Sequence, residues 1–136
     1  MKNSIMFVDD SVNVLESLKW IFKDEPYFLF VFDNPDDALS MAGLVEFSVV
    51  VAEHSMKKMD GIELLKRVKE KSPHTIGLIM TGYVDFKEAL DCIYPGCVYQ
   101  YIKKPLDNGE IKQKVKSAIV HYEIISENKR PAAPIL

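Results

Sequence analysis

Several acidic, hydroxyl and ammonium side chains stand directly after short apolar runs. Asp9 and Asp10 follow the first run, Glu53 the third and Thr81 the fourth, and Lys104 comes just after the fifth. If these runs are parallel strands of one sheet, their carboxyl ends meet at one edge, where such sheets place their functional groups. We therefore expect three carboxylates, a hydroxyl and an ammonium to converge there.

A cluster of three carboxylates is electrostatically costly unless a positive charge neutralises it. Lys104 is one candidate for that charge, and a divalent cation is another. Taken singly, each residue has an ordinary explanation: the aspartates suit a helix cap, Thr81 a loop and Lys104 a solvated surface. Their coincidence at the ends of four apolar runs favours a functional site.

The apolar runs that must position these residues recur five times, and each is followed by residues with helical spacing. Most are continuous rather than alternating, which is typical of strands covered on both faces in a parallel sheet. Because strand–helix–strand crossovers are right-handed, this alternation predicts an α/β fold, a three-layer doubly wound (βα)₅ sandwich with a five-stranded parallel sheet. The predicted strands are Ser4–Val8, Phe28–Phe32, Ser48–Ala52, Ile76–Met80 and Val98–Ile102.

Helix-capping residues separate the runs. Asp60 with Glu63 three residues later forms a capping-box arrangement, and Asp107 with Glu110 forms another. Apolar residues then recur at helical spacing, so each segment has one face that can cover the sheet. The five apolar stripes run over 14–22, 38–45, 62–68, 86–93 and 111–122.

The composition excludes several classes of protein. The 136 residues suit one domain, and 48% hydrophobic with 27% charged residues is typical of a globular chain. Seventeen basic against twenty acidic side chains give a net charge of −3, which argues against a nucleic-acid surface. Apolar runs such as Val49–Ala52 are too short to cross a membrane, and no signal peptide precedes them. We therefore expect a cytoplasmic protein.

Four motifs in sequence order resemble those of the receiver domain of two-component response regulators. The resemblance implies a flavodoxin-like fold and a phosphorylation-driven switch in phosphorelay signal transduction, in a signalling module rather than an enzyme. It covers nearly the whole chain and predicts a receiver domain over 1–125, with a tail or linker over 126–136. The motifs are Phe7-Val8-Asp9-Asp10, Met59-Asp60-Gly61-Ile62-Glu63-Leu64-Leu65, Met80-Thr81-Gly82-Tyr83 and Tyr101-Ile102-Lys103-Lys104-Pro105.

The resemblance also implies roles for individual residues. In such domains an aspartate that ends the third strand takes a phosphoryl group from a histidine kinase, and an acid pair holds Mg²⁺. Carried over to this sequence, Asp9 and Asp10 are the acid pair, and Thr81 and Lys104 contact the phosphoryl oxygens. Tyr101 is the aromatic switch residue, which turns inward when the threonine moves.

The acceptor position departs from the family pattern. In the family, the acceptor aspartate lies seven residues before the aspartate of the Asp-Gly pair. Counting seven residues back from Asp60 reaches Glu53, whose side chain is one methylene longer than that of aspartate. The extra bond displaces the attacking oxygen by about 1 Å, a shift that costs on the order of a hundredfold in a reaction governed by positioning. We therefore interpret Glu53 as a partial mimic of phosphorylated aspartate that reaches toward Lys104 and Thr81. The domain would then be a degenerate receiver, biased to the active state or locked in one state.

The same departure affects the expected metal site. The predicted Mg²⁺ ligands are Asp9, Asp10, Glu53 and the main-chain carbonyl of Ser55, an oxygen set that this ion prefers. We expect Mg²⁺ binding to be weakened, because Lys104 can pair with Glu53 directly.

Two alternatives remain at this point. One is a working phosphoacceptor that takes a phosphoryl group from a histidine kinase with Mg²⁺, because the Glu53 carboxylate is still a nucleophile. The other is a flavodoxin-like protein that binds a flavin or a nucleotide. Against it, the acidic residues after the first run repel a phosphate unless a metal intervenes.

The resemblance suggests protein partners and neither a nucleic acid nor a membrane. Candidates are a histidine kinase or phosphotransfer protein, an output domain, and a second copy that pairs through the fourth helix, fifth strand and fifth helix. That face includes Phe86, Tyr94, Tyr99 and Lys116, a mixture that suits a polar-rimmed interface. The remaining residues contain no output motif, so we expect a stand-alone receiver or a fragment of a longer protein.

Overall fold

The computed structural model describes residues 2–82 and 96–129, with side chains as far as Glu127. The predicted fourth helix, over 86–93, lies outside the described residues, as do Phe86 and Tyr94 of the predicted pairing face. All five predicted strands and the other four predicted helices lie within the described residues.

The five predicted strands form one parallel sheet in the order β2-β1-β3-β4-β5, which confirms the predicted fold class. The strand order reverses between β1 and β3, the kind of switch point at which doubly wound sheets place their sites. Every strand boundary lies within two residues of its prediction. The strands are β1 Asn3–Val8, β2 Tyr27–Phe32, β3 Val49–Glu53, β4 Ile76–Thr81 and β5 Gln100–Lys103.

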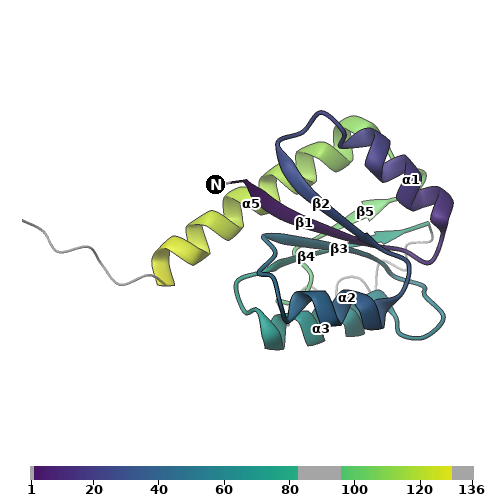
Figure 1. Ribbon diagram of the computed structural model, residues 1–136. Coiled ribbons are helices and arrows are strands. Elements are labelled where there is room, and N and C mark those ends of the chain that lie inside the picture. The colour runs from purple at the N-terminus through teal and green to yellow at the C-terminus, as the bar shows by residue number, and fades with distance from the viewer. Residues whose placement is uncertain (1, 83–95, 130–136) are drawn as a thin grey trace, which may run out of the picture.

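Helices cover both faces of this sheet (Figure 1). The helices α1 (Val12–Ile21) and α5 (Asn108–Lys129) lie on one face, and α2 (Pro35–Ala42) and α3 (Gly61–Lys71) lie on the other. Each face has its own buried apolar cluster, so the sheet is the middle of three layers. None of the helices in the described ranges combines the length and the apolar character needed to cross a bilayer.

The predicted helix starts are formed by the predicted side chains. The Asp60 carboxylate accepts a hydrogen bond from the Glu63 N–H at 2.8 Å, and Asp107 accepts one from the Glu110 N–H at the same distance. These bonds satisfy amides that have no partner within the helix. The helix α5 continues to Lys129, past the predicted start of the tail at 126. That domain boundary stays a prediction.

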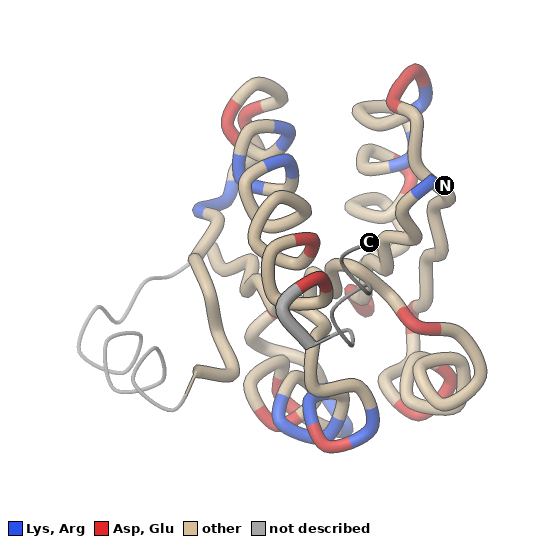
Figure 2. The backbone as a smooth tube through the Cα atoms, turned by 90° about the vertical axis from the view of Figure 1, so that its left-hand side faces the viewer, with Lys and Arg blue, Asp and Glu red and all other residues tan. Residues whose placement is uncertain are grey.

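Charged residues are concentrated on helices and loops (Figure 2). The strands contain only two charged residues, Glu53 at the end of β3 and Lys103 at the end of β5. Buried strands exclude charge because an ionised group loses its hydration there. Glu53 is therefore the exception that needs an explanation.

Candidate functional site

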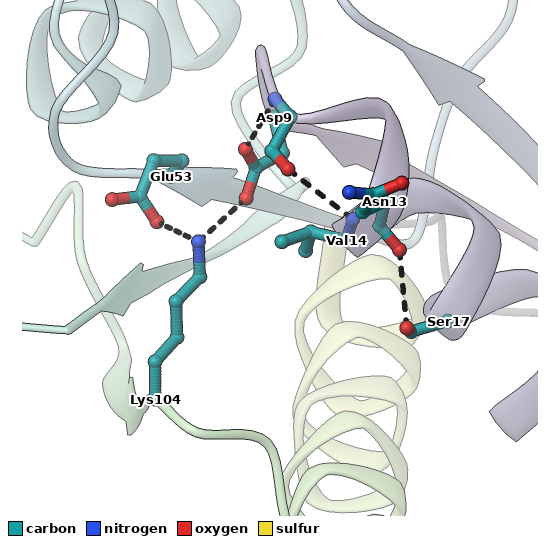
Figure 3. Close-up of polar contacts among 7 residues, drawn as sticks. Asp9, Asn13, Val14, Ser17, Glu53 and Lys104 are labelled. Carbon is teal, nitrogen blue, oxygen red and sulfur yellow. Dashed lines mark hydrogen bonds and ion pairs between the residues drawn. The ribbon is translucent and has the colours of Figure 1, made fainter.

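Three charged side chains meet at the carboxyl end of the central strands (Figure 3). The Lys104 Nζ donates a hydrogen bond to Asp9 Oδ2 at 2.8 Å and lies 2.7 Å from Glu53 Oε2. Asp9 and Glu53 come together because β1 and β3 are neighbours whose last paired residues are Val8 and Ala52. The structure therefore forms the core of the predicted cluster, with one ammonium between two carboxylates.

Both carboxylates are buried. Asp9 is 1% exposed and Glu53 is 8% exposed, whereas the Lys104 side chain keeps 20% of its surface accessible. Two buried negative charges would repel each other and lack hydration, so each needs a positive partner close by. Lys104 supplies that partner for both.

Asp9 is held in place from a second side. Its Oδ1 accepts a hydrogen bond from the Ser11 N–H at 2.9 Å, while Ser11 Oγ accepts one from the Val14 N–H and caps α1. A carboxylate that receives both an ammonium and an amide donor is well satisfied in its charged form. The cap therefore links the first turn of α1 to the charge cluster.

Glu53 is satisfied less completely. Its Oε2 faces the Lys104 Nζ as an ion pair, but the contact lacks the angles of a hydrogen bond, and no other donor in the described part of the chain reaches this oxygen. A buried carboxylate oxygen normally accepts at least one hydrogen bond. Glu53 is consequently held by charge rather than by directional bonding.

The surroundings of Lys104 change its pKa. Burial alone lowers the pKa of the ammonium, but the contacts with Asp9 and Glu53 and the negative charges of both carboxylates outweigh it. The net pKa lies above the ordinary lysine value of 10.5. Lys104 is therefore a fixed positive charge at neutral pH.

Two of the predicted site residues lie inside strands rather than after them. Glu53 is the last residue of β3 and Thr81 is the last residue of β4, because the parallel ladder continues through the pair Glu53 and Met80. The His54 N–H then donates to the Met80 carbonyl at 2.9 Å and extends the pairing by one more bond. Strand geometry, rather than a loop, fixes where Glu53 leaves the backbone.

Gly61 contributes to the site in a way that the sequence did not reveal. A Cβ atom at this position would lie 2.3 Å from the Glu53 carbonyl oxygen, so no other residue fits without movement. The Gly61 N–H donates to the His54 carbonyl at 2.9 Å. The start of α3 thereby packs directly on the backbone that carries Glu53. The only sequence feature that points to this contact is the Asp60-Gly61 pair, which belongs to one of the motifs that resemble the receiver family.

Thr81 and Tyr101 occupy neighbouring strands beside the cluster. Thr81 is buried, and its carbonyl accepts a hydrogen bond from the Lys104 N–H at 2.9 Å, which ties the end of β4 to the lysine. Tyr101 lies partly buried in β5 against the apolar cluster under α2 and α3. Its carbonyl accepts a hydrogen bond from Lys114 of α5. The predicted switch residue is therefore anchored through its backbone.

The remaining predicted metal ligands, Asp10 and Ser55, are exposed, and the described ion pairs of Lys104 are those with Asp9 and Glu53. Within residues 2–82 and 96–129, no group of three or more acidic, histidine or cysteine side chains is arranged to hold a metal ion. The donor types suit Mg²⁺, but the position between Asp9 and Glu53 is filled by an ammonium. Binding of Mg²⁺ by these residues stays a prediction.

Comparisons of the sequence with known proteins agree on one family. The sequence model of the response regulator receiver domain matches residues 5–116. The transcriptional regulatory protein FixJ of Bradyrhizobium diazoefficiens is 31% identical over 135 residues, which is 98% of this chain. The chain spans 65% of the length of FixJ.

Comparisons of the structure lead to the same fold. The signal receiver domain of an HD domain-containing protein from Pseudomonas fluorescens matches with a TM-score of 0.84 and 28% identity, covering 90% of this chain and 98% of that one. A CheY-like receiver domain protein from Methanospirillum hungatei matches with a TM-score of 0.83 and 23% identity, covering 90% and 98% respectively, which shows likeness of fold.

Proposed function

This chain belongs to the response regulator receiver domain family, and we propose that Glu53 stands at its phosphoacceptor position and makes it a degenerate receiver. In this proposal the domain accepts no phosphoryl group and acts as a protein-interaction module held in one state. Membership of the family makes it a signalling module of phosphorelay systems. The proposal concerns how its state is set.

One observation carries this proposal, the contact of 2.7 Å between Glu53 Oε2 and Lys104 Nζ. The resemblance gives this lysine the role of contacting the phosphoryl oxygens on an acceptor. Here its ammonium is already shared between the buried carboxylates of Glu53 and Asp9. The Glu53 carboxylate thus already supplies Lys104 with the negative oxygen that a phosphoryl donor would otherwise provide.

The imitation is partial, because a carboxylate has one negative charge and a phosphoryl group has about −1.5 to −2 at neutral pH. Among the described residues, the ion pair with Lys104 is the only polar contact of Glu53 Oε2, whereas a phosphoryl group would present three acceptor oxygens. We therefore propose that the resting state is held by Lys104 alone. The packing of Tyr101 against the buried cluster under α2 and α3 supports an inward, active-like position of the switch residue.

We further propose that Mg²⁺ binds only weakly. Lys104 already neutralises Asp9 and Glu53, and a divalent ion at the same place would have to displace its ammonium. Asp10 remains available at the surface as a single carboxylate. Calorimetric titration should therefore detect weaker Mg²⁺ binding to the wild type than to Glu53→Asp, and micromolar binding to the wild type would contradict this proposal.

The partners follow from the family. We propose that the domain docks on a histidine kinase or phosphotransfer protein, on an output domain, or on both. FixJ, which is a transcriptional regulatory protein, extends beyond the matched region, and this supports an output domain as one partner. Pairing through the fourth helix, β5 and α5 stays a prediction, because much of that face lies outside the described residues.

Mass spectrometry tests the proposal directly. The protein is incubated with Mg²⁺ and acetyl phosphate, or with a phosphorylated histidine kinase, and then weighed intact. We expect no gain in the mass of the wild type. Glu53→Asp should gain one phosphoryl group, because the shorter carboxylate restores the attacking position, with release of acetate from acetyl phosphate. Glu53→Gln has no nucleophilic carboxylate and is the negative control.

A wild-type phosphoprotein that is absent from Glu53→Gln would overturn the proposal in favour of a working acceptor. The Lys104 contact would then be a resting arrangement that opens for phosphoryl transfer. Cleavage of the adduct by hydroxylamine, with release of phosphate, would identify it as an acyl phosphate.

A further inference from the structure

The β2 strand is an open edge of the sheet with an unusual composition. Among the described strands, β2 pairs only with β1 and has no strand on its other side. Its six residues, Tyr27–Phe32, are all aromatic or aliphatic, without a charge, a proline or a glycine. Natural edge strands are usually short, charged or interrupted, because a flat apolar edge pairs readily with another chain. The opposite edge, β5, follows that rule with four residues and the exposed Lys103.

The backbone of β2 offers hydrogen-bonding groups on its open side. Alternate residues of a strand direct their N–H and C=O groups to opposite sides. The Phe32 carbonyl accepts a hydrogen bond from the Asp9 N–H at 3.1 Å, so its backbone groups face β1. The backbone N–H and C=O groups of Leu29 and Val31, which lie three residues and one residue before Phe32, therefore point away from β1 toward the open side. An extended strand is the partner that satisfies such a row.

The side chains of β2 add an apolar surface along this edge. Phe28 is 54% exposed, and the Lys2 ammonium lies 5.3 Å from the centre of its ring. The other five side chains are partly buried and pack against the clusters on the two faces of the sheet. A strand laid along β2 would extend both clusters, because both of its faces are apolar.

The charges at the two ends of β2 have opposite balance. The Tyr27 end is bordered by Lys2, Lys23, Asp24 and Glu25, and Glu25 pairs with Lys112 at 3.6 Å, which leaves three positive against two negative charges. The Phe32 end is bordered by Asp10, Asp33, Asp36 and Asp37, with Lys58 4.0 Å from Asp36, which leaves four negative against one positive. Antiparallel pairing of two copies brings each basic end next to an acidic end.

We propose that β2 is a self-association edge through which two copies of this chain pair antiparallel, about a two-fold axis perpendicular to the sheet. This symmetry keeps α1 and α5 of both copies on one face and joins the two sheets into one continuous sheet. The same strand supplies both halves of the interface, so no other partner is required. The contact is separate from the Glu53 cluster and from the pairing face at β5 and α5.

Sedimentation velocity on the full chain tests for the dimer, from roughly 5 μM to roughly 0.5 mM, the range in which small interfaces associate. We expect a reversible monomer–dimer equilibrium that Phe28→Lys weakens at least about tenfold, because a lysine on an edge strand blocks pairing. Leu44→Lys is the matched control: Leu44 is 81% exposed outside β2, and its replacement should leave the equilibrium unchanged. Circular dichroism checks that both variants are folded.

Amide hydrogen exchange at low and high protein concentration identifies the surface. The Leu29 and Val31 amides should gain protection in the dimer, whereas the Phe28 and Phe30 amides, which face β1, should change little. A protein that stays monomeric at the highest concentration would overturn the proposal. A dimer protected at β5 and α5 instead, a dimer equally stable in Phe28→Lys, or growth into open-ended fibrils would overturn it as well.

Discussion

The carboxyl end of the sheet and its β2 edge leave their polar groups in opposite conditions. At the carboxyl end, two buried carboxylates are neutralised by an ammonium from the same chain. Along β2, backbone groups and the exposed Phe28 are left to solvent or to another chain. Interactions within the charge cluster should affect the free energy of unfolding, because all partners belong to one chain. Interactions at the open edge of β2 should affect self-association, because a partner strand must come from another chain. Substitutions in the two regions should therefore separate these measurements.

The largest effect is expected from Lys104→Met, which leaves Asp9 and Glu53 buried without a counter-charge. Removing one partner of a buried ion pair costs about 3 kcal/mol in the free energy of unfolding, measured by urea denaturation. Phe28→Lys, at the open edge, should change monomer stability by less than about 0.5 kcal/mol, because the side chain is already half exposed.

Glu53→Gln is the control for this interpretation. In the double variant with Lys104→Met, one of the two repelling charges is gone, so part of the lost stability should return. If Lys104→Met is no less stable than the wild type, the cluster does not hold its charges as the structure indicates.

A somewhat smaller loss, about 2 kcal/mol, is expected from Gly61→Ala, whose new methyl group would press on the Glu53 carbonyl at 2.3 Å. Gly77→Ala is the matched variant away from the site, because its Cβ would lie 2.6 Å from the Cys97 carbonyl oxygen. Both should lower the urea midpoint. Only Gly61→Ala should shift the side-chain nitrogen resonance of Lys104, and equal shifts in both variants would argue against a positioning role.

The smallest effect is a loss of stability at alkaline pH. The folded state raises the pKa of Lys104 above 10.5, so it binds the proton more tightly than the unfolded chain does. Its contribution is therefore complete below about pH 10.5 and declines as the pH rises through the higher folded pKa. The difference in unfolding free energy between the wild type and Lys104→Met should narrow over this range.

The β2 edge contains a second alkaline group that must be separated from the first. Burial and the Glu25 charge raise the pKa of the Tyr27 phenol above 10.0, so its contribution also falls with rising pH. The substitution Tyr27→Phe removes the contribution of this phenol to the pH dependence of stability. A wild-type minus Lys104→Met difference that stays constant to pH 12 in the Tyr27→Phe background would contradict the role given to Lys104.

The fold followed from the sequence because five apolar runs, interrupted by capping residues, leave few alternatives to a parallel sheet. The meeting of Asp9, Glu53 and Lys104 followed in turn, because parallel strands end at a common edge. Asp10 and Ser55 are both exposed, and their orientation toward a metal ion stays a prediction. Such orientations depend on loop backbone geometry, which spacing along the chain does not encode.

Two further features also escaped prediction. The contact of Gly61 with the Glu53 carbonyl is a long-range packing constraint, and a single sequence shows only that a glycine is present. The open side of β2 depends on strand order, which places the most aromatic run at the rim of the sheet instead of its centre.

The sharing of one ammonium by two acids has a consequence for the history of the domain. Glutamate and aspartate codons differ by one nucleotide, and trimming the side chain at position 53 would leave the lysine bonded to Asp9. Under the function proposed above, a single point mutation would therefore convert this chain into a receiver that accepts a phosphoryl group from a donor. Gain and loss of signal dependence would then be easily reversible events within one lineage.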